Sequence, residues 1–134
     1  MIRTTQFKTS YGRNTLLHLF SDPSFLLPRL FPPIKAVKTK ALSYEADGRF
    51  LGMRFYIQGS VLISENEIVY SMLLNAGGKQ GVGKLTIIIN EPTVNIRFEY
   101  EGWMERVSGI FFMDRWFSHF VKDLEEHIGE YIKH

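Results

Sequence analysis

The C-terminal end of the chain carries the strongest hydrophobic pattern. From Gly109 to Lys133, apolar side chains recur at helical spacing and form one broad face at about 100° per residue. That face contains Met113, Trp116, Phe117, Phe120, Val121, Leu124, Ile128, Tyr131 and Ile132. The opposite face is polar and contains Arg115, Ser118, His119, Lys122, Glu125, Glu126 and Lys133. The pattern predicts one long amphipathic helix over 109–133 that lies against another apolar surface.

Between Lys35 and Met104 the pattern changes to the alternation that is typical of half-buried strands. The strands predicted are Ala36 to Tyr44, Arg49 to Ile57, Ser60 to Ser64, Glu67 to Leu74, Lys84 to Asn90 and Thr93 to Trp103. The expected turns are Ala46-Asp47-Gly48, Gln58-Gly59, Glu65-Asn66, the run Gly77 to Gly83, and Glu91-Pro92. Because short turns join antiparallel neighbours, we expect one antiparallel sheet.

The last of these strands has the clearest alternation. Its apolar positions are Val94, Ile96, Phe98 and Tyr100, and its polar positions are Asn95, Arg97, Glu99 and Glu101. One face of the sheet is therefore expected to be dry and the other solvated.

The N-terminal segment predicts one strand and two short helices. The strand covers Ile2 to Thr9, and a helix follows over 12–20 with Ser10 as a candidate N-cap. Asp22 before Pro23 is a second start signal, because an N-cap oxygen followed by proline suits the first helical turn. We expect this second helix to end near Phe31, because prolines follow.

The composition narrows the classes of protein. The chain of 134 residues is 45% hydrophobic and 22% charged, which predicts one globular domain over 1–134. A net charge of +2 gives no support for a nucleic-acid partner. The chain has no cysteine, which excludes disulfides, thiolate metal sites and cysteine nucleophiles. We expect a cytoplasmic location, because no segment has the pattern of a signal peptide or a membrane span.

The order of elements resembles that of a known superfamily. The most specific segments are Asn14-Thr15-Leu16-Leu17-His18-Leu19-Phe20-Ser21-Asp22-Pro23 and Leu30-Phe31-Pro32-Pro33-Ile34. With these segments, the chain resembles the START-like (SRPBCC) superfamily, which includes the birch-pollen allergen and the polyketide cyclases. The resemblance implies an α+β helix-grip fold, in which a curved antiparallel sheet of about seven strands wraps around a long C-terminal helix. It also implies a cavity between them, where known relatives hold lipids, sterols, aromatic polyketides or plant hormones.

Methionine and aromatic side chains are concentrated on the surfaces that would face this cavity. The candidate ligand-binding residues are Met53, Phe55, Met72, Leu74, Phe98, Tyr100, Met113, Trp116, Phe117 and Phe120. Flexible thioethers and flat rings suit an adaptable apolar site. The alternative is that the same residues simply fill a core.

A glycine-rich segment resembles a phosphate-binding loop without completing it. Leu85 replaces the required hydroxyl residue after Lys84, and a strand follows where a helix N-terminus is needed. We interpret the segment as a flexible hairpin loop at the cavity mouth, with a lysine available for an anionic head group. Its residues are Gly78, Lys79, Gly81, Gly83 and Lys84.

The sequence indicates neither a metal site nor a catalytic site. His18 and His119 fall on polar helix faces, and His127 falls at the edge of an apolar one. The charged residues of the last strand point away from the interior, so no acid–base pair is expected inside. Tyr100 points inward, and we interpret it as orienting a ligand. We therefore predict no catalytic residue, no metal and no cofactor.

The leading functional hypothesis is a noncatalytic carrier or sensor of a hydrophobic small molecule. A cyclase- or aromatase-type enzyme using the same cavity is the first alternative. A second alternative is a contact with a membrane or protein partner, or a homodimer contact, through the ridge Ile110, Phe111, Phe112, Met113 and Trp116.

Overall fold

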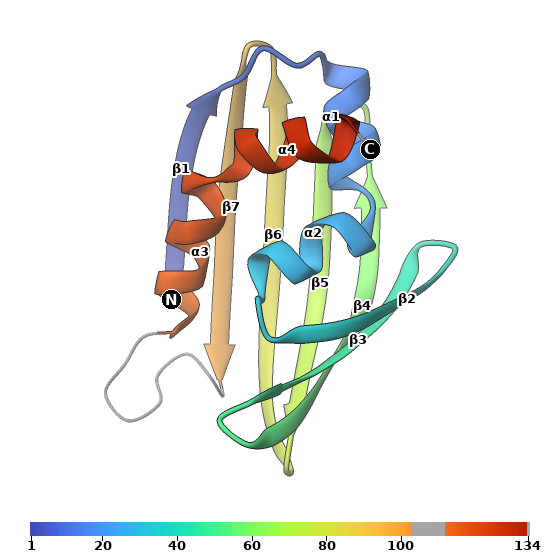
Figure 1. The fold of residues 1–134 in the computed structure, drawn as a ribbon, viewed down its shortest axis with the longest axis vertical. Coiled ribbons are helices and arrows are strands. Elements are labelled where there is room, and N and C mark those ends of the chain that lie inside the picture. Colours follow the sequence, from blue (N-terminus) through green and yellow to red (C-terminus); the bar gives the residue numbers. More distant parts are fainter. Residues whose placement is uncertain (103–111, 134) are drawn as a thin grey trace.

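The computed structural model describes residues 1–102 and 112–133 of the chain. Figure 1 shows the helices on one face of a single curved sheet. The strands are β1 (Ile2–Lys8), β2 (Ile34–Lys40), β3 (Ser43–Phe50), β4 (Met53–Ile63), β5 (Glu67–Ala76), β6 (Lys79–Asn90) and β7 (Thr93–Gly102). The helices are α1 (Arg13–Phe20), α2 (Pro23–Leu30), α3 (Phe112–Lys122) and α4 (Leu124–Lys133).

All strand pairs in the sheet are antiparallel. The spatial order is β1-β7-β6-β5-β4-β3-β2, so the N-terminal strand pairs with the last one and the other strands follow as consecutive hairpins. This arrangement confirms the predicted α+β helix-grip fold, with a curved antiparallel sheet below the C-terminal helical segment.

Strict alternation places one face of the sheet in the core. Val94, Ile96, Phe98 and Tyr100 of β7 are buried, whereas Arg97 is exposed. Strands β5 and β6 follow the same pattern, and their inward residues pack with the apolar sides of α1 and α2. The dry face predicted from β7 is therefore confirmed, and it continues across the sheet.

The C-terminal segment is two helices and not the single helix expected over 109–133. Helix α3 ends at Lys122, α4 begins at Leu124, and the chain changes direction between them (Figure 1). The bend keeps Phe120 buried on one side and Leu124 and Ile128 buried on the other.

Three of the predicted turns are wrong. Ala46 to Gly48 lies inside β3, Gln58-Gly59 lies inside β4, and most of Gly77 to Gly83 lies inside β6. The predicted strands Ala36 to Tyr44, Arg49 to Ile57, Ser60 to Ser64 and Lys84 to Asn90 therefore have wrong boundaries. The connections instead lie near Ala41 and Leu51, which adopt positive φ angles of 52° and 54°. Neither residue type signals such a turn in a sequence, because this backbone region is disfavoured for side chains other than glycine, asparagine and aspartate.

The two misread glycines allow close approach of the backbone. A Cβ atom on Gly48 would lie 2.2 Å from the carbonyl oxygen of Pro33. A Cβ atom on Gly59 would lie 1.8 Å from the carbonyl oxygen of Ser71 on the neighbouring strand. These positions accept only glycine, and they let the β3–β4 part of the sheet curve toward the helices.

Of the two predicted N-cap residues, one is confirmed and one is wrong. Asp22 caps α2 as predicted, since its carboxylate accepts a hydrogen bond from the Ser24 N–H at 2.9 Å. The prediction of Ser10 as the cap of α1 is wrong, because Gly12 is the N-cap and has no side chain to accept a bond. The carboxylate of Glu91 instead accepts from the Arg13 N–H.

Two buried tyrosines on the inner face of the sheet donate hydrogen bonds to backbone carbonyls. The Tyr44 hydroxyl donates to the Ser71 carbonyl at 2.7 Å, directly above Gly59. The Tyr70 hydroxyl donates to the Phe20 carbonyl and ties the end of α1 to the sheet. The two ring centroids are 5.9 Å apart. Both hydroxyls therefore serve as structural donors, and burial raises the pKa of both tyrosines well above the ordinary value.

Removing the Tyr44 hydroxyl should destabilise the sheet. In a Tyr44→Phe variant, the Ser71 carbonyl loses its side-chain donor inside the core, and we expect the free energy of unfolding to fall by about 1–3 kcal/mol. Tyr56→Phe is the matched control, because Tyr56 is exposed on the other face of β4. Urea unfolding of both variants measures the difference, and equal stabilities would contradict the role assigned to Tyr44.

The raised tyrosine pKa values predict a loss of stability in alkali. The pKa of tyrosine in an unfolded chain is about 10, so above that pH the unfolded chain releases protons that the native protein retains. The contribution of Tyr70 is constant below about pH 10 and decreases as the pH rises further. Urea unfolding between about pH 8 and about pH 11 should show a steeper decline for the native chain than for Tyr70→Phe. Equal slopes would refute the buried, protonated state of this residue.

Candidate functional site

Aromatic rings from four elements meet between the sheet and α3. We call these residues the ring cluster: Phe31, Phe50, Phe98, Tyr100, Trp116 and Phe117. The rings of Phe98 and Phe117 stack with centroids 5.7 Å apart. Phe31 meets Phe98 edge-on at 6.3 Å and Trp116 edge-on at 6.1 Å. The contacts join α2, α3 and β7 into one apolar layer.

The structure brings the predicted cavity residues together in one core. Eight of them are buried: Phe55, Met72, Leu74, Phe98, Tyr100, Met113, Phe117 and Phe120. Met53 and Trp116 are half-buried and pack against the same core. In this conformation the side chains lie against one another, so their role in holding a ligand remains a prediction.

Two members of the ring cluster were missed from the sequence. Phe31 follows α2 and was assigned only as the end of a helix, and Phe50 precedes the β3–β4 turn, whose position was wrong. Phe50 lies 5.1 Å from Trp116, centroid to centroid. With the turn placed correctly after Phe50, the alternation along β3 would have put Phe50 on the same face as the buried Tyr44 and Ala46.

Below the ring cluster, β6 has a glycine, Gly83, and therefore no side chain on the inner face of the sheet. Gly83 is buried on the inner face, and the register places Met72 and Tyr100 on its two sides. A Cβ atom on Gly83 would lie 3.2 Å from Cδ2 of Tyr100 and 3.5 Å from Sδ of Met72. The space above the glycine is therefore filled by one ring and one flexible thioether.

The glycine-rich segment is not a loop. Strand β6 begins at Lys79, and the turn consists of Gly77 and Gly78 with φ angles of 54° and 81°. Lys79 has the inward phase of Gly81 and Gly83, whereas Lys84 is exposed on the outer face and pairs with Glu99 across the strands. The segment also lacks the helix start that a phosphate-binding loop needs.

The interior that the structure describes is poor in chemically reactive groups. Thr9 is the buried polar side chain of the described core, and the hydroxyls of Tyr44 and Tyr70 donate to backbone carbonyls. Within residues 1–102 and 112–133, histidine and carboxylate side chains form no group that could hold a metal ion. The available surface is thus suited to apolar contact.

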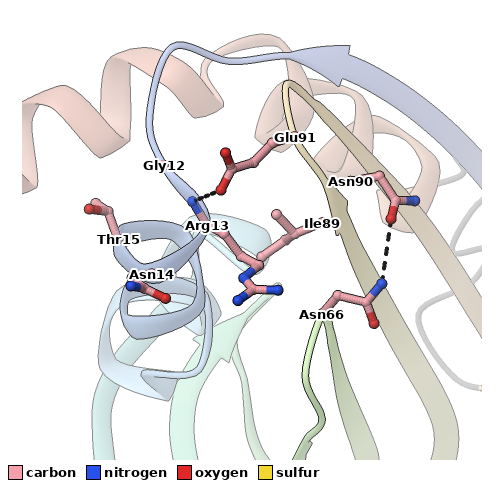
Figure 2. Close-up of a pocket in the computed structure, with 8 residues that line it drawn as sticks. All are labelled: Gly12, Arg13, Asn14, Thr15, Asn66, Ile89, Asn90 and Glu91. Atoms are coloured by element: carbon pink, nitrogen blue, oxygen red, sulfur yellow. Dashed lines mark hydrogen bonds between the residues drawn. The ribbon is translucent and has the colours of Figure 1, made fainter.

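A separate hollow of about 740 Å³ lies near the start of α1 (Figure 2). It is lined by Gly12, Arg13, Asn14, Thr15, Asn66, Ile89, Asn90 and Glu91. The lining is mostly polar, and an Asn66 amide donates to Asn90 at 3.4 Å across its edge. It shares no residue with the predicted cavity.

No helix in the described part of the chain is long and apolar enough to cross a membrane. The ridge predicted to contact a membrane or a partner includes Ile110 and Phe111, which lie outside the described residues, as does the end of the predicted strand at Trp103.

Comparisons with known proteins agree with this architecture. A protein-family model matches residues 1–134. A hypothetical protein from Sulfolobus tokodaii is 25% identical, with a TM-score of 0.74 over 98% of this chain and 97% of that one. Major latex-like protein 151 from Panax ginseng is 12% identical, with a TM-score of 0.60 over 95% and 96% of the two chains.

The allergen Ara h 8.0201 is 10% identical, with a TM-score of 0.61 over 98% of this chain and 97% of its own. No protein of curated function matches the sequence. One family model thus covers the whole chain, and the chain shares its helix-grip fold with the ginseng latex-like protein and Ara h 8.0201.

Proposed function

We propose that this protein binds a hydrophobic small molecule between the inner face of the sheet and α3. The observation that carries the proposal is the ring cluster above Gly83, where the nearest side chains on the inner face are those of Met72 and Tyr100. Rings and thioethers can rearrange around an apolar guest at low cost. The resemblance to a superfamily of hydrophobic-ligand binders supports the same conclusion.

The attachment of α3 gives a route by which the site can open. Within the described residues, α3 meets the sheet through side chains and forms no backbone pairs with it. An exposed ion pair joins Asp114 of α3 to Arg3 of β1 at 2.7 Å, and such pairs contribute little to stability. The break at Asp123 lets α3 shift while α4 stays packed through Leu124 and Ile128. An outward shift of α3 would separate Phe117 from Phe98.

The lining limits the chemistry of the ligand. Phe31, Phe98 and Phe117 offer flat apolar surfaces, which favour an aromatic ring system or a folded acyl chain. Tyr100 is the ring-cluster residue with a hydroxyl, and we assign it the orientation of a polar group on the ligand. Lys79, on the inward phase of β6, is the lysine placed to meet an acidic group at the end of the site.

Native mass spectrometry of the purified protein, followed by organic extraction, tests the proposal directly. A co-purified lipid or aromatic compound would support it and identify the ligand class. If the protein converts that compound chemically, the carrier hypothesis is wrong and the enzyme alternative holds. An empty protein that also fails to bind 1-anilinonaphthalene-8-sulfonate and oleate would contradict the proposal.

Filling the space above Gly83 should weaken ligand binding. We expect Gly83→Leu to weaken the affinity for these two probes at least about tenfold, because the new side chain occupies the volume between Met72 and Tyr100. Val82→Leu is the matched control, since Val82 is the next residue of β6 and is exposed on the outer face. Fluorescence titration measures both affinities, and circular dichroism verifies the fold.

Unchanged affinity in Gly83→Leu, or an equal loss in Val82→Leu, would place the site elsewhere. Should Gly83→Leu fail to fold, Tyr100→Phe gives a second test with little change in volume. It should weaken the binding of oleate through its carboxylate while leaving a probe without polar groups unaffected.

A further inference from the structure

The turn between β3 and β4 presents an apolar side chain to solvent. Leu51 is 61% exposed, and its φ angle of 54° lies in a region that leucine rarely adopts. Folding alone would favour asparagine or glycine here, because an exposed leucine gains no burial from this conformation. Leu51 therefore suggests a partner outside the chain.

The residues on both sides of Leu51 hold the turn in place. The Phe50 ring lies edge-on to Trp116 of α3, with centroids 5.1 Å apart. On the other strand, the Met53 methyl carbon lies 3.1 Å from where a Cβ atom of Gly77 would be. The turn is thus braced against α3 and the β5–β6 turn, while Leu51 projects from it.

Positive charge lies directly behind this apolar tip. Arg49 and Arg54 are exposed and face each other across the two strands, an arrangement in which like charges repel. Together with Lys35 they line a hollow of about 420 Å³ that also contains Asp47. Asp47 lies 3.9 Å from Arg54, and Arg49 forms no ion pair within the described part of the chain. Three cations thus share one carboxylate, so the hollow suits an anion.

We propose that the β3–β4 turn docks on the surface of anionic phospholipid membranes. Leu51 enters the interface between head groups and acyl chains, and Arg49, Arg54 and Lys35 bind lipid phosphates. The arginines stand two or three residues behind Leu51, which at about 3.3 Å per residue places them roughly 7–10 Å back along the strands. That spacing matches the roughly 5–10 Å depth of apolar side chains at a membrane interface. Guanidinium groups are well suited to phosphate oxygens, because they bind them in pairs.

The β2–β3 turn offers an internal comparison. Leu42 is 52% exposed there, beside Lys38 and Lys40. Like the β3–β4 turn, it combines cations with a carboxylate, since Lys38 faces Glu45 directly across the strands, but its cations are lysines and not arginines. Its variants are therefore matched controls for those of the β3–β4 turn.

Vesicle co-sedimentation tests the proposal. We expect the native chain to bind phosphatidylcholine vesicles that contain about 30% phosphatidylglycerol and to bind pure phosphatidylcholine far less. Leu51→Asn should weaken binding about tenfold, and asparagine tolerates the same backbone conformation. Arg49→Gln with Arg54→Gln should weaken it about 25-fold, from roughly a fivefold effect of each charge.

The controls are Leu42→Asn and Lys38→Gln with Lys40→Gln, which should retain binding. Failure of the native chain to sediment with anionic vesicles would overturn the proposal, as would an equal loss in the controls. Calorimetric titration with inorganic phosphate in the absence of lipid separates the two sources of phosphate. Phosphate binding that is lost in Arg49→Gln with Arg54→Gln, together with no sedimentation with anionic vesicles, would assign the hollow to free phosphate and overturn the docking proposal.

Discussion

The close approach of β4 and β5 at Gly59 is the constraint on which the rest of this structure depends. A side chain at position 59 would collide with the Ser71 carbonyl. Because Gly59 has none, the Tyr44 hydroxyl lies in that space and donates a hydrogen bond to the same carbonyl. The sheet can curve there, and a curved sheet with one dry face must be covered on its concave side. The positions of α1, α2 and α3 follow from that requirement (Figure 1).

The helices that cover the sheet are attached to it in different ways. Asp22 caps α2, buried leucines of α1 and α2 pack in the core, and the hydrogen bond from Tyr70 to the Phe20 carbonyl anchors α1. Helix α3 depends instead on ring contacts and an exposed ion pair, and it ends at a break in the helix. The helix over the ring cluster is thus held by apolar side-chain contacts and one exposed ion pair, and this is the physical basis for proposing a ligand there.

The parts of the fold that were predicted correctly depend on local features of the sequence. The alternation of Val94, Ile96 and Phe98 fixed the inner face of β7, and Asp22 before Pro23 fixed the start of α2. Glycines were misread, because a glycine looks the same in a sequence whether it forms a turn or permits close approach. Gly48 and Gly59 permit close approach, while the turns beside them use Ala41 and Leu51.

The break at Asp123 was missed because burial of apolar residues continues at helical spacing on both sides of it. The face of α3 in the candidate site was predicted, but its contacts with Phe31 and Phe50 depend on segments that meet only in the folded chain.

The central claim is that an apolar guest enters between α3 and the sheet, and methionine methyl spectra test it most directly. Met72 lies on the inner face of the sheet and Met113 is buried on α3, whereas Leu62 is exposed on the outer face of β4. With ¹³C-methyl methionine and leucine and 1-anilinonaphthalene-8-sulfonate, we expect Met72 and Met113 to shift and to show intermolecular Overhauser effects to the probe, while Leu62 does not. Saturation of the protein with probe while both methyl resonances stay unchanged would contradict the claim.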